Sequence, residues 1–456
     1  MDCVILQRPM SGQRPQMTQD LQTRQRVLVK TLGCKVNQCE SEAILSALTV
    51  PESGFIPGDA HRSDVVIVNT CAVTARAAMQ SRQTIRQVIR SHPDAFVVVT
   101  GCHAQTSPET VSAIDGVARI VKNSDKLRIP HMLLDQTPAP DTAGDASFMG
   151  IPGIGPGSRT RPTLKIQDGC DAFCTYCIVP YARGRSRSMP VDQVMAGLSR
   201  LAQAGAKEVV LTGIHVGCYG QDLSPPTDLG TLLCRVLEKK DIPQVRLSSI
   251  EPAELSDAVI DLAAAPGPFS GKLCPHFHIP LQSGDNDILA RMHRPYSREF
   301  FKERVHAVVA RIPDAAIGVD VLVGFPGETD AAFDHTYTLI EALPVAYLHV
   351  FPFSPRKGTP AFSFKPKVPE PVIKARCEHL RQLGERKRHE FYGRQMGKTV
   401  TILVEAARDK KTGLLKGFTG NYVPVCMDGP DLLFNTFQNI YIAKMADGIL
   451  IGHQRF

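Results

Sequence analysis

Short β-branched runs alternate with helical segments along most of this chain, and this alternation constrains the fold most strongly. In the first series, residues 26–134, the runs Val27–Val29, Val65–Val68 and Val97–Val99 are separated by longer polar stretches. A second series starts near Leu164 and contains six strand–helix units. Because parallel strands must be joined by long crossovers, usually helices, both series predict α/β architecture with parallel sheets.

Changes in composition divide the chain into five segments. Six strand–helix units favour a partial (β/α)6 barrel over the closed eight-fold barrel. Short strands broken by Gly, Asp and Asn near the C-terminus predict a small all-β barrel. The expected segments are a polar tail at 1–25, an open parallel α/β sheet domain at 26–137, a Pro/Gly-rich linker at 138–157, the partial barrel at 158–396 and the all-β barrel at 397–456.

The bulk composition excludes some classes of protein. The chain has 456 residues, 43% of them hydrophobic, yet no stretch approaches the roughly 20 consecutive apolar residues of a membrane helix. Its polar N-terminus lacks the apolar core of a secretory signal, so we expect a cytoplasmic protein without a membrane partner. That compartment keeps thiols reduced, so we do not expect disulfides among the 13 cysteines. The net charge of +7 is compatible with an anionic partner such as nucleic acid.

Cys170, Cys174 and Cys177 form a C-x3-C-x2-C pattern just after a predicted strand. Three thiolates can hold three corners of a [4Fe–4S] cluster and leave the fourth iron open to a ligand. The alternatives are a zinc site or ordinary core cysteines. Zinc usually takes a fourth ligand, and the nearest candidate, His215, is distant in sequence.

Cys34, Cys71 and Cys102 each lie one to three residues past a predicted strand of the first series. The carboxyl ends of parallel strands share one edge of a sheet, where ligands gather. The sequence therefore predicts a second three-cysteine site. The alternative is that these are buried cysteines at strand ends.

The segment Gly169–Cys177, with aromatic Tyr176 before the last cysteine, resembles the signature of the radical S-adenosylmethionine superfamily. From about residue 26 to the end, the chain resembles the methylthiotransferases, whose C-terminal β-barrel is called TRAM. Within that family, Thr31–Gln38 and His349–Ser354 are similar to the branch that acts on N6-threonylcarbamoyladenosine in tRNA.

This resemblance implies two [4Fe–4S] clusters and a radical reaction. S-adenosylmethionine would serve both as methyl donor and as radical source, and a methylthio group would be added to C2 of N6-threonylcarbamoyladenosine at position 37 of tRNA. The implied electron donor is a protein such as flavodoxin or ferredoxin. Alternatives are a methylthiotransferase for isopentenyladenosine or for a ribosomal-protein aspartate, and, from a different class, a non-catalytic RNA-binding metal protein.

Contacts to the cofactor and the RNA are expected at strand ends and on charged helices. Glycines and polar residues at strand ends can approach a ligand, although the same glycines can simply turn the chain. Basic helix faces suit phosphates but are often only solvated, and Tyr422 is equally a candidate core or turn residue. The candidates for S-adenosylmethionine are Tyr176, Gly213, Ser248, Gln282 and Asp320; those for RNA are Arg82, Arg86, Arg90, Arg386, Arg388 and Tyr422. Arg183, Arg185 and Arg187 are either anion-binding or a solvated charge run.

Overall fold

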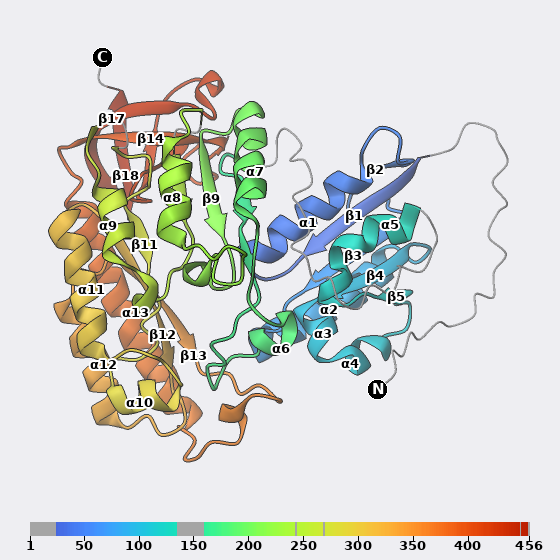
Figure 1. Ribbon diagram of the computed structural model, residues 1–456, viewed down its shortest axis with the longest axis horizontal. Coiled ribbons are helices and arrows are strands. Elements are labelled where there is room, and N and C mark those ends of the chain that lie inside the picture. The colour runs from blue at the N-terminus through green and yellow to red at the C-terminus, as the bar shows by residue number, and fades with distance from the viewer. Residues whose placement is uncertain (1–23, 135–158, 242–243, 268–269, 447, 455–456) are drawn as a thin grey trace. The chain divides into compact units, whose positions relative to one another are not determined.

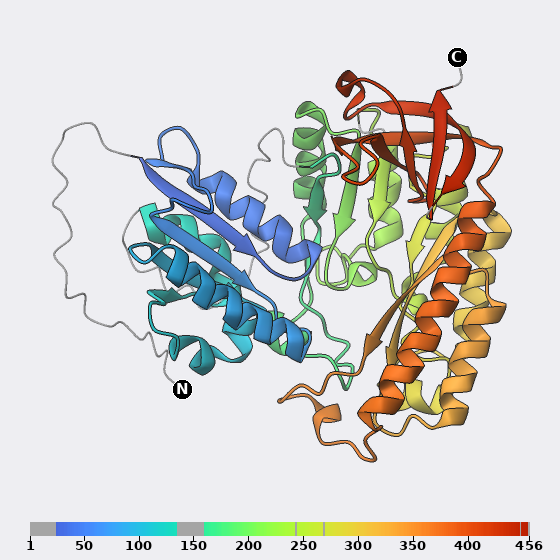
Figure 2. The same ribbon diagram turned by 180° about the vertical axis from the view of Figure 1, so that it is seen from behind.

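The computed structural model describes residues 24–134, 159–241, 244–267, 270–446 and 448–454. The chain divides into two compact units (Figures 1 and 2). Among the described residues, the first unit comprises 24–134 together with the short segment 181–183, and the second comprises the remainder. Sequence composition places residues 181–183 in the barrel region, whereas their packing assigns them to the first unit.

The first unit is an open parallel sheet with strand order β2-β1-β3-β4-β5. Its strands are buried on both faces: Val27 and Ile67 pack on one side, and Val66 and Val68 on the other. Helices cover both faces, which confirms the predicted α/β sheet. The strands are β1 (Gln25–Thr31), β2 (Phe55–Pro57), β3 (Val65–Thr70), β4 (Phe96–Gly101) and β5 (Arg119–Ile120); the helices are α1 (Lys35–Leu48), α2 (Ala75–Ser91), α3 (Cys102–Thr106), α4 (Pro108–Ser112) and α5 (Ile129–Leu134).

The second unit is built on six parallel strands, as the six strand–helix units predicted. Two three-stranded sheets, β10-β9-β6 and β11-β12-β13, are joined by parallel bridges between Val245 and Leu273 and between Ser249 and His278. This arrangement is the expected partial (β/α)6 barrel. Its strands are β6 (Thr163–Lys165), β9 (Glu208–Thr212), β10 (Gln244–Leu247), β11 (His276–His278), β12 (Ala316–Val323) and β13 (Tyr347–Pro352).

Helices pack on one side of these strands. Along β12, Ile317, Val319 and Val321 are buried in the main apolar core, which also contains residues of the helices. The alternate residues Gly318 and Asp320 lie on the opposite, inner face, because successive side chains of a strand point to opposite sides. The helices are α6 (Val179–Arg183), α7 (Val191–Gln203), α8 (Leu229–Glu238), α9 (Asp257–Ala264), α10 (Asn286–Arg291), α11 (Arg298–Arg311), α12 (Asp330–Ala342) and α13 (Glu370–Gly393), and a short antiparallel pair joins β7 (Gln167–Asp168) to β8 (Arg187–Ser188).

The C-terminal segment forms a closed barrel, which confirms the predicted all-β fold. The strand order is β14-β15-β16-β18-β17, and the core includes Ile402, Val425 and Ile440. This barrel belongs to the same compact unit as the central strands. Arg246 of β10, for example, donates to the Gly420 carbonyl at 2.8 Å. The strands are β14 (Thr399–Arg408), β15 (Leu415–Thr419), β16 (Pro424–Met427), β17 (Phe437–Ala446) and β18 (Ile449–Gln454).

Two predictions fall at the limits of the described chain. The expected linker 138–157 lies outside the described residues, and so does the expected tail 1–25 apart from its last two residues, of which Gln25 begins β1. Within the described part of the chain, no helix has the length and apolar character needed to cross a membrane.

Candidate iron–sulfur sites

The loop that carries Cys170, Cys174 and Cys177 follows β6 and β7 at the carboxyl end of the central sheet. Gly169 precedes it with φ +72°, and a Cβ there would lie 1.9 Å from the Arg185 carbonyl oxygen, so only glycine permits this close approach. The Cys177 amide donates to the Cys174 carbonyl at 2.9 Å, which folds the last cysteines into a tight turn. The backbone therefore brings the last two cysteines of the loop close together.

The electrostatics of this loop suit thiolates bound to a cationic centre. Burial raises the pKa of Cys177 to about 12, and the neighbouring Cys174 and Cys170 add to the increase. Three thiolates so close together repel one another unless positive charge compensates them. Arg294 supplies part of that charge, since its guanidinium donates to the Cys174 sulfur at 3.3 Å. The donor set thus fits the three cysteine ligands of a [4Fe–4S] cluster.

His215 lies beside this loop, although it is distant in sequence. Its Nδ1 is 3.5 Å from the Cys170 sulfur, and its Nε2 is 2.6 Å from a Glu254 carboxylate oxygen. The Gln167 side chain accepts from the His215 amide at 2.7 Å and so holds the backbone near the cluster loop. His215 is therefore a neighbour of the cysteine loop, and its distance in sequence does not exclude it from the site.

Sequence reasoning also missed an acidic and a basic group next to the cysteines. Glu251, which follows β10, forms an ion pair with Arg294, whose side chain is only 4% exposed. Arg294 also packs on the Tyr296 ring, 5.0 Å from its centroid. No sequence pattern marks Glu251 or Arg294 as part of a site, because the two residues are far apart in sequence and meet only in the folded barrel.

The residues expected to contact S-adenosylmethionine have different surroundings. The buried hydroxyl of Ser248 has no hydrogen-bond partner among the described residues, so it is available to a ligand. A Cβ at Gly213 would lie 2.8 Å from the Gln167 side-chain oxygen, so this glycine serves close packing. Tyr176 packs against a small apolar cluster, Gln282 adopts φ +65°, and Asp320 is hydrogen-bonded to two histidines.

In the first unit, Cys34, Cys71 and Cys102 follow β1, β3 and β4. Gly33 has φ +97°, and a Cβ there would lie 2.9 Å from the Cys71 sulfur. Burial raises the pKa of Cys71, and the nearby Cys102 and Cys34 thiols contribute to the same increase. The three thiols therefore lie close enough to repel one another as thiolates, and this donor set also fits a three-cysteine cluster site.

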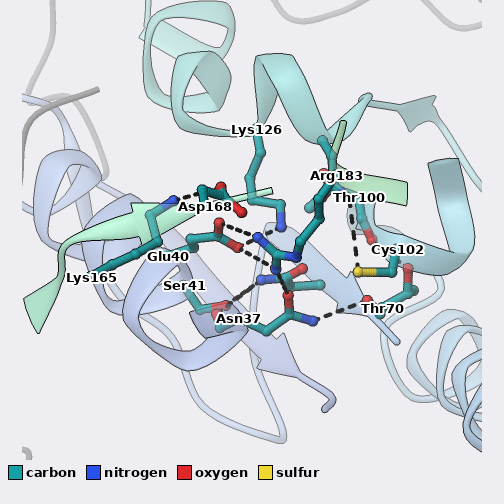
Figure 3. A network of polar contacts seen from close by, with 12 residues as sticks. Asn37, Glu40, Ser41, Thr70, Thr100, Cys102, Lys126, Lys165, Asp168 and Arg183 are labelled. Carbon is teal, nitrogen blue, oxygen red and sulfur yellow. Dashed lines mark hydrogen bonds and ion pairs between the residues drawn. The ribbon is translucent and has the colours of Figure 1, made fainter. Parts of the chain in front are cut away.

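A buried polar network lies next to Cys102 (Figure 3). The Asn37 amide nitrogen donates to the carbonyls of Leu32 at 2.8 Å and Thr70 at 3.1 Å, which ties together the chain just before Cys34 and Cys71. Arg183 donates to the Asn37 side-chain oxygen at 2.6 Å. Asn37 therefore positions two of the three cysteine-bearing turns.

Glu40 is the charged centre of this network (Figure 3). Its carboxylate is 2.6 Å from Lys126 and 3.0 Å from Arg183, and all three side chains are at most 3% exposed. Arg183 is therefore occupied by protein partners. Arg183 thus binds a carboxylate with two nitrogens, as one reading expected, but the carboxylate is that of Glu40. Its burial contradicts the other reading, a solvated charge run.

The basic residues expected to bind RNA fall into two groups. On α2, Arg86 and Arg90 are exposed and Arg82 is half-buried, and none of the three has an ion pair within the described chain. On α13, Arg388 pairs with Glu385, and Arg386 donates to the Tyr337 hydroxyl at 2.9 Å. The α2 arginines are thus more available to phosphates than those of α13.

Tyr422 lies in a turn of the C-terminal barrel and is 37% exposed. Arg246 stacks 4.6 Å from its ring centroid, and the His276 ring is 5.1 Å away. One side of Tyr422 is therefore committed to packing against the central barrel.

Two family models match the chain. The radical SAM superfamily model covers residues 164–340, and a model described as uncharacterized protein family UPF0004 covers residues 26–122. Among solved structures, the radical S-adenosylmethionine methyltransferase TsrM from Kitasatospora setae is similar with a TM-score of 0.55 at 16% identity, covering 74% of this chain and 77% of TsrM. At that identity the likeness shows the fold alone.

Closer relatives are similar over nearly the whole chain. The threonylcarbamoyladenosine tRNA methylthiotransferase MtaB of Bacillus subtilis (strain 168) is 36% identical over 92% of this chain and 94% of its own length. The protein of the same name from Aquifex aeolicus (strain VF5) is 36% identical over 89% and 97%. A tRNA-2-methylthio-N(6)-dimethylallyladenosine synthase from Staphylococcus haemolyticus (strain JCSC1435) is 31% identical over 93% and 84%. The chain therefore belongs to the radical S-adenosylmethionine tRNA methylthiotransferase family.

Proposed function

We propose that the protein adds a methylthio group to C2 of N6-threonylcarbamoyladenosine at position 37 of tRNA. The observation that carries this proposal is the presence of two sets of three cysteines, one set in each unit at the carboxyl ends of parallel strands. Five relatives named for the threonylcarbamoyl substrate are 35–37% identical to this chain, and three named for the dimethylallyl substrate are 31% identical. The threonylcarbamoyl nucleoside is therefore the better supported substrate.

The two sites would hold different clusters with different tasks. Cys170, Cys174 and Cys177 would bind the cluster that cleaves S-adenosylmethionine, and Cys34, Cys71 and Cys102 the cluster that carries the transferred sulfur. When bound, these groups supply the radical chemistry that an unactivated adenine C–H bond requires. The neighbouring side chains would bind and orient these groups. Arg294 offsets thiolate charge, and the unpartnered Ser248 hydroxyl offers a hydrogen bond to the cofactor.

The reaction also needs RNA and electrons. The exposed arginines of α2 offer phosphate contacts of the kind that dominate RNA affinity. A low-potential protein such as flavodoxin or ferredoxin would deliver the electron in the cytoplasm.

The test is anaerobic reconstitution of the wild-type protein and two triple variants. The wild type should bind about eight irons per chain, and each triple Cys→Ala variant about four. Changing Cys170, Cys174 and Cys177 should abolish 5′-deoxyadenosine formation. Changing Cys34, Cys71 and Cys102 should leave that cleavage intact and stop methylthiolation of tRNA.

Cys234→Ala is the matched control, because this exposed thiol is not part of either site. It should retain all the iron and both activities. Bound zinc without the brown colour of iron–sulfur clusters would contradict the proposal and favour a non-catalytic metal protein.

A further inference from the structure

Two imidazoles share one carboxylate on the inner face of the central strands. His278 Nε2 is 2.7 Å and His349 Nδ1 is 3.1 Å from the same oxygen of Asp320. The three residues come from the neighbouring strands β11, β12 and β13, in which His278 pairs with Gly318 and Asp320 with His349. Strand register therefore builds this cluster on a rigid part of the fold.

An aromatic ring backs the cluster. Tyr347 lies across Gly318, where a Cβ would be 2.0 Å from the Tyr347 ring, so the ring can occupy this place only because residue 318 is glycine. The Tyr347 hydroxyl is 2.8 Å from His276 Nε2. Its ring centroid lies 5.2 Å from that of His349 and 6.2 Å from that of His278. His278 and His349 are thus positioned by packing against Tyr347 as well as by hydrogen bonds to Asp320.

One ring nitrogen of the cluster, His349 Nε2, has no hydrogen-bond partner among the described residues. The two histidines hold the pKa of Asp320 at about 2 despite its burial, so the carboxylate is ionised and can only accept. His278 has partners for both ring nitrogens, since its Nδ1 is 2.7 Å from the Ser249 hydroxyl. His349 is 51% exposed, and its Nε2 has no hydrogen-bond partner among the described residues. Asp320 therefore orients an imidazole whose far nitrogen is available to a ligand.

We propose that His349, oriented by Asp320, binds the carboxylate of the threonyl group of the substrate nucleoside. This inference rests on the proposed function and names the side chains that would recognise the threonyl group of the substrate. A protonated imidazole that donates Nε2–H to a carboxylate forms a charge-assisted hydrogen bond. In that imidazolium, Nδ1–H donates to Asp320 on one side of the ring, so Nε2–H faces the ligand on the other side.

The same cluster disfavours an apolar substituent. An isopentenyl group has no polar atom, so docking it here would strip water from His349 and Asp320 without replacing the hydrogen bonds that the water made. A site with buried polar groups discriminates strongly against analogues that leave those groups unpaired. The cluster therefore acts as a specificity element: it attracts the acidic substituent and rejects the apolar one.

The test compares two anticodon stem-loops, one with N6-threonylcarbamoyladenosine and one with its carboxamide, which has nearly the same shape but no charge. Reconstituted holoenzyme should bind the acid about tenfold more tightly than the amide, the loss expected for one charge-assisted hydrogen bond. His349→Gln should weaken binding of the acid by about tenfold and leave binding of the amide unchanged. His306→Gln, at an exposed position of α11, should change neither affinity.

The remaining outcomes separate this inference from the proposed function. If the wild type methylthiolates both stem-loops and binds them equally, the function stands and the inference is wrong. Equal weakening of both ligands by His349→Gln would likewise overturn it, because that result marks a purely structural histidine. A third outcome is that the wild type binds a metal ion in addition to the two clusters, and that both His349→Gln and Asp320→Asn lose it. That result would overturn the inference and identify a metal site instead. Methylthiolation of an isopentenyladenosine stem-loop alone would overturn both.

Discussion

Arg183 and Glu40 form an ion pair of 3.0 Å in which both side chains are at most 3% exposed. Arg183 lies six residues after Cys177, and Glu40 lies six residues after Cys34. Both residues belong to the first unit, so the pair ties the short segment 181–183 to α1 within that unit. Charges withdrawn from water in this way need complete partners, and removal of one partner is costly.

Arg183→Met should destabilise the first unit locally. Loss of the guanidinium removes one buried cation from Glu40 while Lys126 stays in contact with it, so we expect a cost of about 2 kcal/mol. Amide hydrogens of α1 should then exchange about thirty-fold faster by mass spectrometry. Arg185→Met is the control, because Arg185 is 83% exposed in its pair with Asp171 and such pairs contribute little. Equal acceleration in both variants would contradict the account.

The arginines of α2 should contribute to tRNA affinity more than those of α13. Replacing Arg82, Arg86 and Arg90 by Gln removes basic groups that have no ion pair in the described chain. The salt dependence of tRNA binding should fall by about one unit of slope for each phosphate that an arginine no longer neutralises. Replacing Arg386 and Arg388, which have protein partners, should have a much smaller effect. Binding isotherms at several salt concentrations distinguish the two sets, and a larger effect from α13 would refute this ranking.

Asp320 should make stability depend on pH in the acid range. Its pKa falls from 3.8 to about 2 on folding, so its contribution is present above pH 4 and is lost as the pH falls toward 2. Between pH 5 and pH 3 the wild type should lose about 1 kcal/mol that Asp320→Asn does not lose. Denaturant titrations of both proteins at the two pH values measure this difference. Parallel losses would show that Asp320 is not held in its ionised form.

Gly318→Ala should disturb the ring of Tyr347. The new Cβ would overlap the ring, so either Tyr347 must move away from His276 or β12 must shift, at a cost of about 1–3 kcal/mol. Gly393→Ala, at the end of α13 with no atom within 4 Å of the added Cβ, should have little effect. Thermal unfolding of both variants provides the comparison, and an unchanged midpoint for Gly318→Ala would contradict this packing.

The sequence predicted the architecture because alternation of strands and helices is a local signal. The six strands of the central barrel and the β-barrel after residue 397 follow from such patterns. The Cys170–Cys177 loop can be recognised for the same reason, since its three cysteines are close together in sequence. His215, Glu251 and Arg294 were not assigned to the site, because they meet the loop only when strands far apart in sequence become neighbours.

The buried partner of Arg183 could not be predicted, for a different physical reason. Charged residues near a loop usually face solvent, and no local pattern reports that Glu40 and Lys126, far away in sequence, form a buried partner site. The shared carboxylate of His278 and His349 likewise depends on the register of β11, β12 and β13. The register of these strands cannot be predicted from the composition of the sequence.

The nucleoside profile of tRNA tests the central claim most directly. In a strain that carries no second enzyme of this family, deletion of the gene should remove the 2-methylthio form of N6-threonylcarbamoyladenosine and leave the unmethylthiolated nucleoside in its place. Mass spectrometry of digested tRNA measures both species, and the wild-type gene should restore the first whereas the Cys170→Ala gene should not. Persistence of the methylthio form in the deletion strain, or loss of the isopentenyl form instead, would contradict the account.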